Sequence, residues 1–503
     1  MQQARVSGIL LHPTSLPGSV GIGGLGHGAM AFIDFLVRAG QRRWQVLPLG
    51  PTGFGDSPYA CFSSFAGNPL LIDPEQMVAD GFLDPDDLQV ALYDDPSQGG
   101  EPSQVDYGAV IGQRQTLLGR AYRRFVDCPP EGVRERFSAF CDAEAAWLDD
   151  YALFAAVKAH HDGAPWHLWQ PGLKGRQPEV LADWRRRLAS PINSVCFQQF
   201  LFFEQWQRIR RYANERRVKI IGDLPIYVPM DSADVWVNQS LFKLDEDGNP
   251  TVVAGVPPDY FSETGQLWGN PVYDWAAHKA DGYRWWISRI QAQLRMVDIL
   301  RLDHFRGFAD YWEVPAGDDV ATNGCWVEGP GLPLFEALAE ALGDDLPIIA
   351  EDLGIITEAV TDLRDAAGLP GMAVLQFAFD SDARNLHLPH WHTPNQVVYT
   401  GTHDNDTSAG WYLTLDGDRR RFADRYLEGG GERIHRLLLR QALASVARTA
   451  IFPMQDVLGL AGEARMNQPG RASGNWAWRF EEKQLDDSLA DALRDLTHLY
   501  GRA

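Results

Sequence analysis

Eight short apolar runs, each ending in polar or turn-forming residues, restrict the fold of this chain more than any other feature. They occupy residues 8–15, 44–50, 218–225, 297–305, 347–354, 374–380, 397–406 and 451–459. Apolar strands that alternate with amphipathic helices are typical of a parallel sheet covered by helices on both faces. Eight such units predict an α/β fold, a (β/α)8 or TIM barrel, with its active site at the carboxyl ends of the strands.

The length of the chain predicts large insertions in this barrel. One barrel needs about 250 residues, and the chain has 503. The spacing assigns residues 73–196 to a mainly helical insertion between strands two and three, 227–274 to a loop-rich insertion between strands three and four, and 406–434 to a small helical insertion after strand seven. Residues 1–72, 197–226, 275–405 and 435–503 are expected to form the barrel.

The charge and the composition exclude several kinds of partner. The formal net charge is −22, from 45 basic and 67 acidic residues, so the chain would repel nucleic acid and anionic membrane surfaces. No apolar run reaches the roughly 18 residues of a membrane span. The first residues lack the pattern of a secretion signal, and the five cysteines show no CxxC spacing. We expect a cytoplasmic protein with reduced thiols and no metal or cofactor.

Polar side chains gather where the predicted strands end. They are Asp223, Arg301, Asp303, Glu351, His403, Asp404 and Asp456. Arg301 and Asp303 face the same side of their strand because side chains alternate. One interpretation is an ion pair inside the core. The other, which the gathering favours, is that the arginine lowers the pKa of Asp303 and keeps it ionised as a nucleophile.

Glu351 and Asp352 are adjacent acids that would point to opposite faces of a strand, so only one can face the site. Asp352 could cap the helix that follows. Glu351, near a second carboxylate in a partly apolar mouth, would have a raised pKa and could donate a proton. Asp303 and Glu351 then resemble the paired carboxylates of glycoside chemistry.

Two further motifs admit other interpretations. The stretch GIGGLG, residues 21–26, fits a dinucleotide-binding pattern, but about ten residues separate it from its strand. We expect its glycines to form a loop that closely approaches a ligand or another backbone. His12, His304 and His403 lie on three strands and would suit a metal-dependent hydrolase, although no second histidine lies at metal-binding spacing near His403.

Two long loops carry aromatic residues among glycines and prolines. The loops cover residues 51–69 and 255–271, and their aromatic residues include Tyr59, Tyr260, Phe261 and Trp268. Aromatic rings with polar edges suit the flat faces of sugar rings. Residues 463–480 have a similar composition and could either contact a sugar or cap the barrel.

Together these motifs resemble the amylomaltases, bacterial 4-alpha-glucanotransferases of the alpha-amylase superfamily. The resemblance covers essentially the whole chain. It runs through ILLHPTSLPG, PTGFGDSPYACFSSFAGNP, IGDLPIYV, GVPPDYFSETGQLWGNP, RLDHFRGF, AEDLG, GTHDNDT and ARMNQPG with GNWAWR. One departure is that TGFG stands where many relatives have TGYG, so Phe54 lacks a hydroxyl group.

The resemblance implies a role for each of several residues. Asp303 would be the nucleophile that forms a covalent glycosyl-enzyme, Glu351 the acid and base, and Asp404 the stabiliser of the transition state. Arg301 would orient Asp303, and Asp223 and His403 would bind the sugar of the donor. Other substrate-contacting positions match Phe54, Ser57, Tyr59, Asp259 and Trp268.

The resemblance also implies a reaction. The enzyme would move segments of alpha-1,4-glucans between maltooligosaccharides, with glucose as one acceptor, in maltodextrin or glycogen metabolism. The loop with PPDYFSETGQLWGNP would cover the site, and the protein would be a monomer or a weak homo-oligomer. The alternatives are a hydrolase with water as acceptor, a non-catalytic glucan-binding protein, or the metal-dependent hydrolase.

Overall fold

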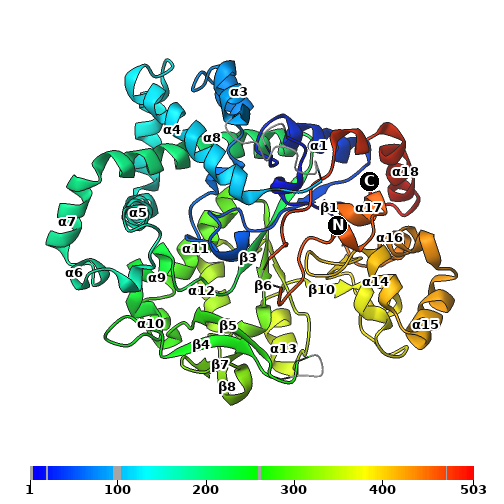
Figure 1. Ribbon diagram of the computed structural model, residues 1–503. Coiled ribbons are helices and arrows are strands. Elements are labelled where there is room, and N and C mark those ends of the chain that lie inside the picture. The colour runs from blue at the N-terminus through cyan, green and yellow to red at the C-terminus, as the bar shows by residue number, and fades with distance from the viewer. Residues whose placement is uncertain (1–3, 19–20, 94–102, 259–261, 472) are drawn as a thin grey trace.

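The chain is built around a barrel of eight parallel strands (Figure 1). The computed structural model describes residues 4–18, 21–93, 103–258, 262–471 and 473–503. The barrel strands are β1 (Val6–Leu10), β2 (Arg43–Gln45), β3 (Lys219–Pro225), β6 (Ile299–Asp303), β9 (Ile348–Ala350), β10 (Gly371–Val374), β11 (Gln396–Tyr399) and β12 (Thr449–Pro453). They follow one another in chain order, with β12 beside β1. The Ala350 amide donates to the Pro370 carbonyl over 2.9 Å, which joins β9 to β10. The predicted (β/α)8 barrel is confirmed.

One of the eight apolar runs was assigned wrongly. The sequence predicts a strand over residues 374–380, but β10 ends at Val374 and Leu375–Phe379 form a 3-10 helix. Phe379 contacts Trp411, Phe422 and Tyr426. The run is therefore apolar because it packs under the helices after β11, and not because it is a strand.

Helices pack around the outside of the barrel. They include α1 (His27–Arg38), α8 (Ala189–Glu215), α11 (Arg284–Met296), α12 (Leu332–Leu342), α13 (Glu358–Ala366), α16 (Ile434–Ala444), α17 (Met454–Leu458) and α18 (Asp487–Leu499). In α18 the buried Ala490, Leu493 and Thr497 recur at spacings of three and four residues. This spacing places one largely apolar stripe of α18 against α1 and α16 in the helical layer.

Further helices occupy the long connections. Between β2 and α8 lie α2 (Pro74–Ala79), α3 (Pro85–Tyr93), α4 (Tyr107–Asp127), α5 (Val133–His160), α6 (Pro171–Lys174) and α7 (Pro178–Arg187). Aromatic contacts hold this part together, and the rings of Phe125 and Phe197 stack 4.7 Å apart. After β11 come α14 (Ser408–Thr414) and α15 (Gly417–Leu427).

A second sheet, which the sequence did not indicate, stands at the carboxyl end of the barrel (bottom of Figure 1). It is antiparallel, in the order β5 (Gln266–Pro271), β4 (Val252–Val256), β7 (Asp310–Pro315) and β8 (Cys325–Glu328). The short helices α9 (Ala233–Val237) and α10 (Trp275–Ala280) flank β4 and β5 along the chain. Because β7 begins seven residues after Asp303, the last residue of β6, this sheet stands beside the predicted site.

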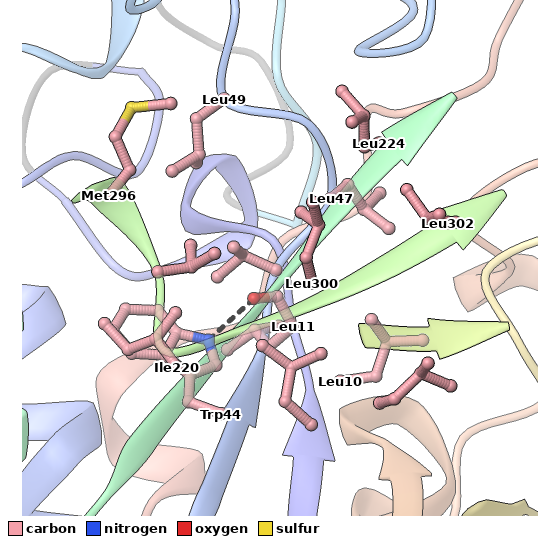
Figure 2. Close-up of a cluster of buried hydrophobic side chains, with 14 of the residues drawn as sticks. Leu10, Leu11, Trp44, Leu47, Leu49, Ile220, Leu224, Met296, Leu300 and Leu302 are labelled. Atoms are coloured by element: carbon pink, nitrogen blue, oxygen red, sulfur yellow. Dashed lines mark hydrogen bonds between the residues drawn. The ribbon is translucent and has the colours of Figure 1, made fainter. Parts of the chain in front are cut away.

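The core of the barrel is apolar. Figure 2 shows Leu10, Leu11, Trp44, Ile220, Leu300 and Leu302 brought together from neighbouring strands, and the indole Nε1 of Trp44 donates to the Leu11 carbonyl over 2.8 Å. The polar strand ends therefore lie next to a largely apolar core. Among the described residues, no helix combines the length and the apolar character that crossing a membrane requires.

The glycines of the GIGGLG stretch serve backbone packing. A Cβ atom on Gly23 would lie 2.0 Å from the Pro13 carbonyl oxygen and 2.7 Å from the Leu16 nitrogen. The Gly23 amide also donates to the Thr14 carbonyl over 3.0 Å. The expectation that these glycines permit a close approach to another backbone is confirmed.

Candidate active site

A cleft of about 1090 Å³ opens at the carboxyl ends of the barrel strands. Strand ends contribute Asp303, His304, His403 and Asp404 to its lining, the loops contribute Phe54, Ser57, Tyr59, Asn467 and Trp476, and β5 contributes Trp268. Residues 266–270 of β5 form part of one wall. The structure therefore brings together most of the site residues that the sequence predicts.

A buried arginine links two carboxylates at the base of the cleft. Arg301 Nη1 donates to both carboxylate oxygens of Asp223 over 2.7 Å, and Arg301 Nη2 lies 2.9 Å from Asp303 Oδ1. Strand register explains the contact, since Asp223 on β3 lies opposite Arg301 on β6. The Tyr59 hydroxyl donates to Asp223 Oδ2 over 2.7 Å. This network fixes the direction in which Asp303 points.

The ionisation of Asp303 differs from the expectation. Arg301 was expected to hold the pKa of Asp303 below its ordinary value. Burial instead raises the pKa of Asp303, and the attraction to Arg301 offsets only part of that rise. The sequence identifies the neighbouring charge but not the depth of burial, which is the larger effect here.

Glu351 is held at the end of β9 by two backbone amides. Its Oε2 accepts from the His304 amide over 2.7 Å and its Oε1 from the Leu353 amide over 3.1 Å. Burial raises the pKa of Glu351 to about 8, with a further contribution from Asp303, against the opposing effect of Arg301. Arg301 forms its ion pair with Asp303, so Glu351 is the member of the pair that holds a proton at neutral pH.

Asp352 faces away from the cleft. Its Oδ1 accepts from the Met372 amide over 2.7 Å, and its Oδ2 binds Arg364 Nη1 at 2.5 Å. The expectation that Asp352 caps the next helix is wrong, because Thr357 occupies the N-cap position of α13. Asp352 instead connects the end of β9 to β10.

His403 and Asp404 form the opposite wall with residues from the loop after β12. His403 Nε2 lies 3.3 Å from Asp404 Oδ1, and the Tyr59 ring stacks on His403 with centroids 5.0 Å apart. Asn467 Nδ2 donates to Asp404 Oδ1 over 2.6 Å. The Trp476 ring lies 5.9 Å from both the His403 and Tyr59 rings.

Sequence reasoning missed Asn467 and Trp476 as individual residues. Both lie in the segment 463–480, whose mixture of amides and aromatic residues is the signal that could have identified them. That composition left contact with a ligand and capping of the barrel equally open, and the described contacts place both residues at the cleft.

The remaining predicted residues lie at the rim or outside the cleft. Phe54 is 86% exposed and Trp268 37%; the Trp268 ring meets His304 edge to face at 4.8 Å. Ser57 Oγ accepts from the Tyr59 amide over 3.2 Å. Asp456, which was predicted at a strand end, lies in α17, is bound to Thr400 and Ser408, and is buried away from the cleft. Asp259, Tyr260 and Phe261 lie outside the described residues.

The histidines that the metal-dependent alternative requires do not come together as ligands of one metal ion. Within the described parts of the chain, no group of three or more histidine, cysteine, aspartate or glutamate side chains is placed to hold a metal ion. Burial lowers the pKa of His12 to about 3, and burial also lowers the pKa of His304 to about 4.

A (β/α)8 barrel with paired carboxylates and aromatic walls around an open cleft is the arrangement of an enzyme that acts on glycosidic bonds. The chain belongs to the 4-alpha-glucanotransferase family, whose model matches residues 11–485. The resemblance to amylomaltases is thereby confirmed.

Individual relatives match over the full length. The chain is 52% identical to a 4-alpha-glucanotransferase of Synechocystis, covering 100% of this chain and 99% of the relative. It is 48% identical to a 4-alpha-glucanotransferase of Thermus thermophilus, covering 98% of each. Among solved structures, the amylomaltase from Streptococcus agalactiae in complex with acarbose superposes with a TM-score of 0.95 at 42% identity, covering 99% of this chain and 100% of that one.

Proposed function

We propose that this protein is a retaining 4-alpha-glucanotransferase that moves segments of alpha-1,4-glucans between maltooligosaccharides. The observation that carries the proposal is the difference between two carboxyl groups at one strand edge. Asp303 is ion-paired with Arg301, whereas Glu351 has a pKa of about 8 and holds a proton at neutral pH. A nucleophile and a proton donor with these properties are what a retaining mechanism requires.

In the first step, Glu351 gives its proton to the departing 4-oxygen of the donor while Asp303 Oδ attacks the anomeric carbon. The glycosidic bond breaks and an ester bond to Asp303 forms. In the second step, Glu351 takes the proton from the 4-hydroxyl of an acceptor sugar, whose oxygen displaces Asp303 and restores the alpha configuration. The two carboxyl groups are expected about 5–5.5 Å apart.

The surrounding residues would bind the sugar in the donor site. Asp404, which accepts a hydrogen bond from Asn467, would accept hydrogen bonds from hydroxyl groups of the donor sugar as positive charge develops on the ring. Asp223, Arg301, His403 and Tyr59 form one connected network beside it. Ser57, Phe54, Trp268 and Asp259 would contact further sugar units, and Phe54 would stack on a sugar without donating a hydrogen bond.

The acceptor distinguishes a transferase from a hydrolase. We propose that residues 227–274, the insertion that includes β5, cover the site, exclude water and so favour a sugar as acceptor, with glucose among the acceptors. Maltotriose alone should then yield glucose together with maltooligosaccharides longer than maltotriose. Chromatography that detects only glucose and maltose would instead establish the hydrolase.

Asp303→Asn tests the nucleophile. We expect transfer from maltotriose to fall by roughly four orders of magnitude or more, with unchanged thermal unfolding. Asp310→Asn is the matched control, because Asp310 pairs with Arg306 at 2.8 Å outside the cleft lining. Turnover by Asp303→Asn close to that of the control would refute the assignment.

The cellular setting is a further part of the proposal. The five cysteines are free in the structure, which fits the reducing cytoplasm and a role in maltodextrin or glycogen metabolism there. We propose a monomer or weak homo-oligomer, in which the barrel ranges given above carry the catalysis and the insertions at 73–196 and 406–434 support it.

A further inference from the structure

A second cavity of about 400 Å³ lies outside the catalytic cleft and shares no lining residue with it. It is enclosed by α5, by the segment from α9 to Leu241, by α11 and by the loop at Ser63 and Phe65. These helices lie together in the left half of Figure 1. Its volume is within the range of about 300–1,000 Å³ that small-molecule sites occupy.

Aromatic side chains form much of its wall. They come from three separate elements: Phe65, Trp147, Tyr151 and Trp285. Trp147 is half-buried and fixed in orientation, because its Nε1 donates to Glu144 Oε2 at 2.5 Å and its ring lies nearly parallel to Phe65 at 6.5 Å. A fixed aromatic face provides a large contact area at little cost in conformational entropy.

The charged groups around this cavity are held within the protein, most of them in ion pairs and Asp234 by the Ser64 amide. Asp150 binds Arg176 at 2.9 Å and Arg185 at 3.3 Å. Arg295, on the α11 side, binds Glu144 at 3.0 Å. Asp281 lies 3.8 Å from Arg284. A ligand with a net charge would have to compete with these pairs, so the cavity favours a neutral ligand.

Polar groups nevertheless remain for hydrogen bonding. The indole Nε1 of Trp285 and Asp281 Oδ1 lack a hydrogen-bond partner among the described residues, but both atoms are buried beneath the cavity wall, so they do not themselves face a ligand. Ser288 and Gln291 are exposed at the edge of the same cavity and offer a hydroxyl and an amide. A neutral ring with apolar faces and a hydroxylated edge satisfies both the aromatic wall and these groups.

We propose that this cavity binds a glucosyl unit of an alpha-1,4-glucan and holds long chains on the enzyme outside the catalytic cleft. The inference rests on the proposed function, because that function supplies the glucan. The loop that ends at Phe65 also carries Tyr59. The Ser64 amide donates to Asp234 Oδ2 over 2.8 Å, and Asp234 also lines the cavity. The cavity wall and the donor site therefore share one short segment.

Two variants impair binding in the cavity in different ways. Trp147→Ala deletes the fixed aromatic face, and Ser288→Trp fills the mouth from an exposed position without removing a packed side chain. Trp391→Ala is the matched control, because Trp391 is 49% exposed and lines neither the catalytic cleft nor the second cavity. All three are made in the active enzyme and also in Asp303→Asn, where maltohexaose binds without being turned over.

Calorimetric titration of Asp303→Asn with maltohexaose should give one binding site fewer when either Trp147→Ala or Ser288→Trp is added. In the active enzyme, both variants should raise KM for amylose by roughly threefold to tenfold, the value of one aromatic contact, and leave kcat and KM for maltotriose unchanged. The control should alter neither measurement.

Three results would overturn the inference. The number of maltohexaose sites could stay unchanged, the variants could affect amylose and maltotriose kinetics equally, or Ser288→Trp could leave maltohexaose binding undiminished. Failure of the proposed function is recognised separately, since the parent enzyme would then form no longer oligosaccharides from maltotriose. A neutral ligand other than a glucan would leave the maltohexaose site number unaffected and so refute the proposal.

Discussion

At the scale of single residues, Glu351 connects local structure most directly to chemistry. Its raised pKa of about 8 means that it is protonated below pH 8 and loses the proton above it. Since the first step needs the protonated form, kcat/KM for maltotriose should decline as the pH rises through about 8. Glu351→Gln should lower kcat/KM by about 100-fold to 10,000-fold and abolish this alkaline limb.

An activated donor provides the control for Glu351. Alpha-maltotriosyl fluoride has a leaving group that needs no proton, so Glu351→Gln should still release a burst of fluoride as the ester to Asp303 forms. The later transfer to an acceptor should remain slow because the base is missing. Equal impairment of the fluoride burst and of maltotriose transfer would contradict the acid role.

The same scale marks where prediction from sequence succeeds and where it stops. Asp223, Arg301 and Asp303 could be placed together because strand ends meet at one edge of a parallel barrel. Asn467 could not, since it reaches Asp404 from 63 residues further along the chain in a loop of irregular structure. The prediction that the pKa of Asp303 is lowered was wrong, because the depth of burial cannot be inferred from the neighbouring residues in the sequence.

At the scale of elements, Asp352 stabilises the junction between β9 and β10. Its carboxylate accepts from the Met372 amide and binds Arg364, and the side chain is 6% exposed. Asp352→Asn removes one charge of a largely buried pair and should lower the free energy of unfolding by about 2–4 kcal/mol. Urea unfolding monitored by circular dichroism measures this loss.

Asp365→Asn is the matched control for Asp352. Asp365 pairs with the same Arg364 at 2.7 Å but is 61% exposed, so solvent screening makes its pair worth little. If the two variants unfold at the same urea concentration, the connection between β9 and β10 does not depend on Asp352.

Elements differ in how far the sequence predicts them. The barrel strands were recognisable because strands buried on both faces are continuously apolar. The sheet of β4, β5, β7 and β8 was not recognisable, since its strands are short and partly exposed. β4 and β5 contain glycine, β5 and β7 contain proline, and β5 is exposed over most of its length. The run that ends at Phe379 resembled a strand in sequence because packing under α14 and α15 also requires apolar residues.

At the scale of the whole molecule, buried histidines connect stability to pH. His278 is fully buried among Tyr273, Trp275 and Trp285, and both of its ring nitrogens lack a hydrogen-bond partner among the described residues. Burial lowers its pKa from 6.5 to about 4. Between these values the unfolded chain binds a proton that the folded chain does not, so the stability falls as the pH falls.

His278→Phe should weaken this pH dependence. Between pH 7 and pH 5 the variant should lose roughly 1–2 kcal/mol less stability than the parent protein, because one group no longer binds a proton on unfolding. Trp275→Phe is the control: it alters the same cluster, and its cost should be equal at both pH values. Urea unfolding at each pH gives the comparison, and parallel curves for His278→Phe and the parent would exclude His278 as a source.

Arg502 joins the two ends of the chain at the base of the barrel, where the ends lie near each other (Figure 1). Its side chain is fully buried, and it donates to the carbonyl oxygens of Val6, Ala442, Leu443, Ser445, Ala447 and Arg448 at 2.7 to 3.4 Å. These carbonyls belong to β1, to α16 and to the turn before β12, so one guanidinium group connects segments that are far apart in sequence.

Arg502→Ala should therefore destabilise the whole barrel and not one helix. The Leu443 and Ser445 carbonyls would still accept from Arg5, and the Arg448 carbonyl from the Val6 amide. The other carbonyls would lose the Arg502 donor, at about 1–3 kcal/mol for each one that water does not reach, so we expect a total loss of roughly 3–5 kcal/mol. Arg502→Lys should recover only part, because an ammonium group has fewer donors than the guanidinium fork. Arg494→Ala, on the exposed side of α18 where Arg494 pairs with Asp491, should have little effect. Loss of protection from hydrogen exchange in β1 and β12 together would show that Arg502 holds the barrel closed, whereas a loss confined to α18 would limit its role to docking that helix.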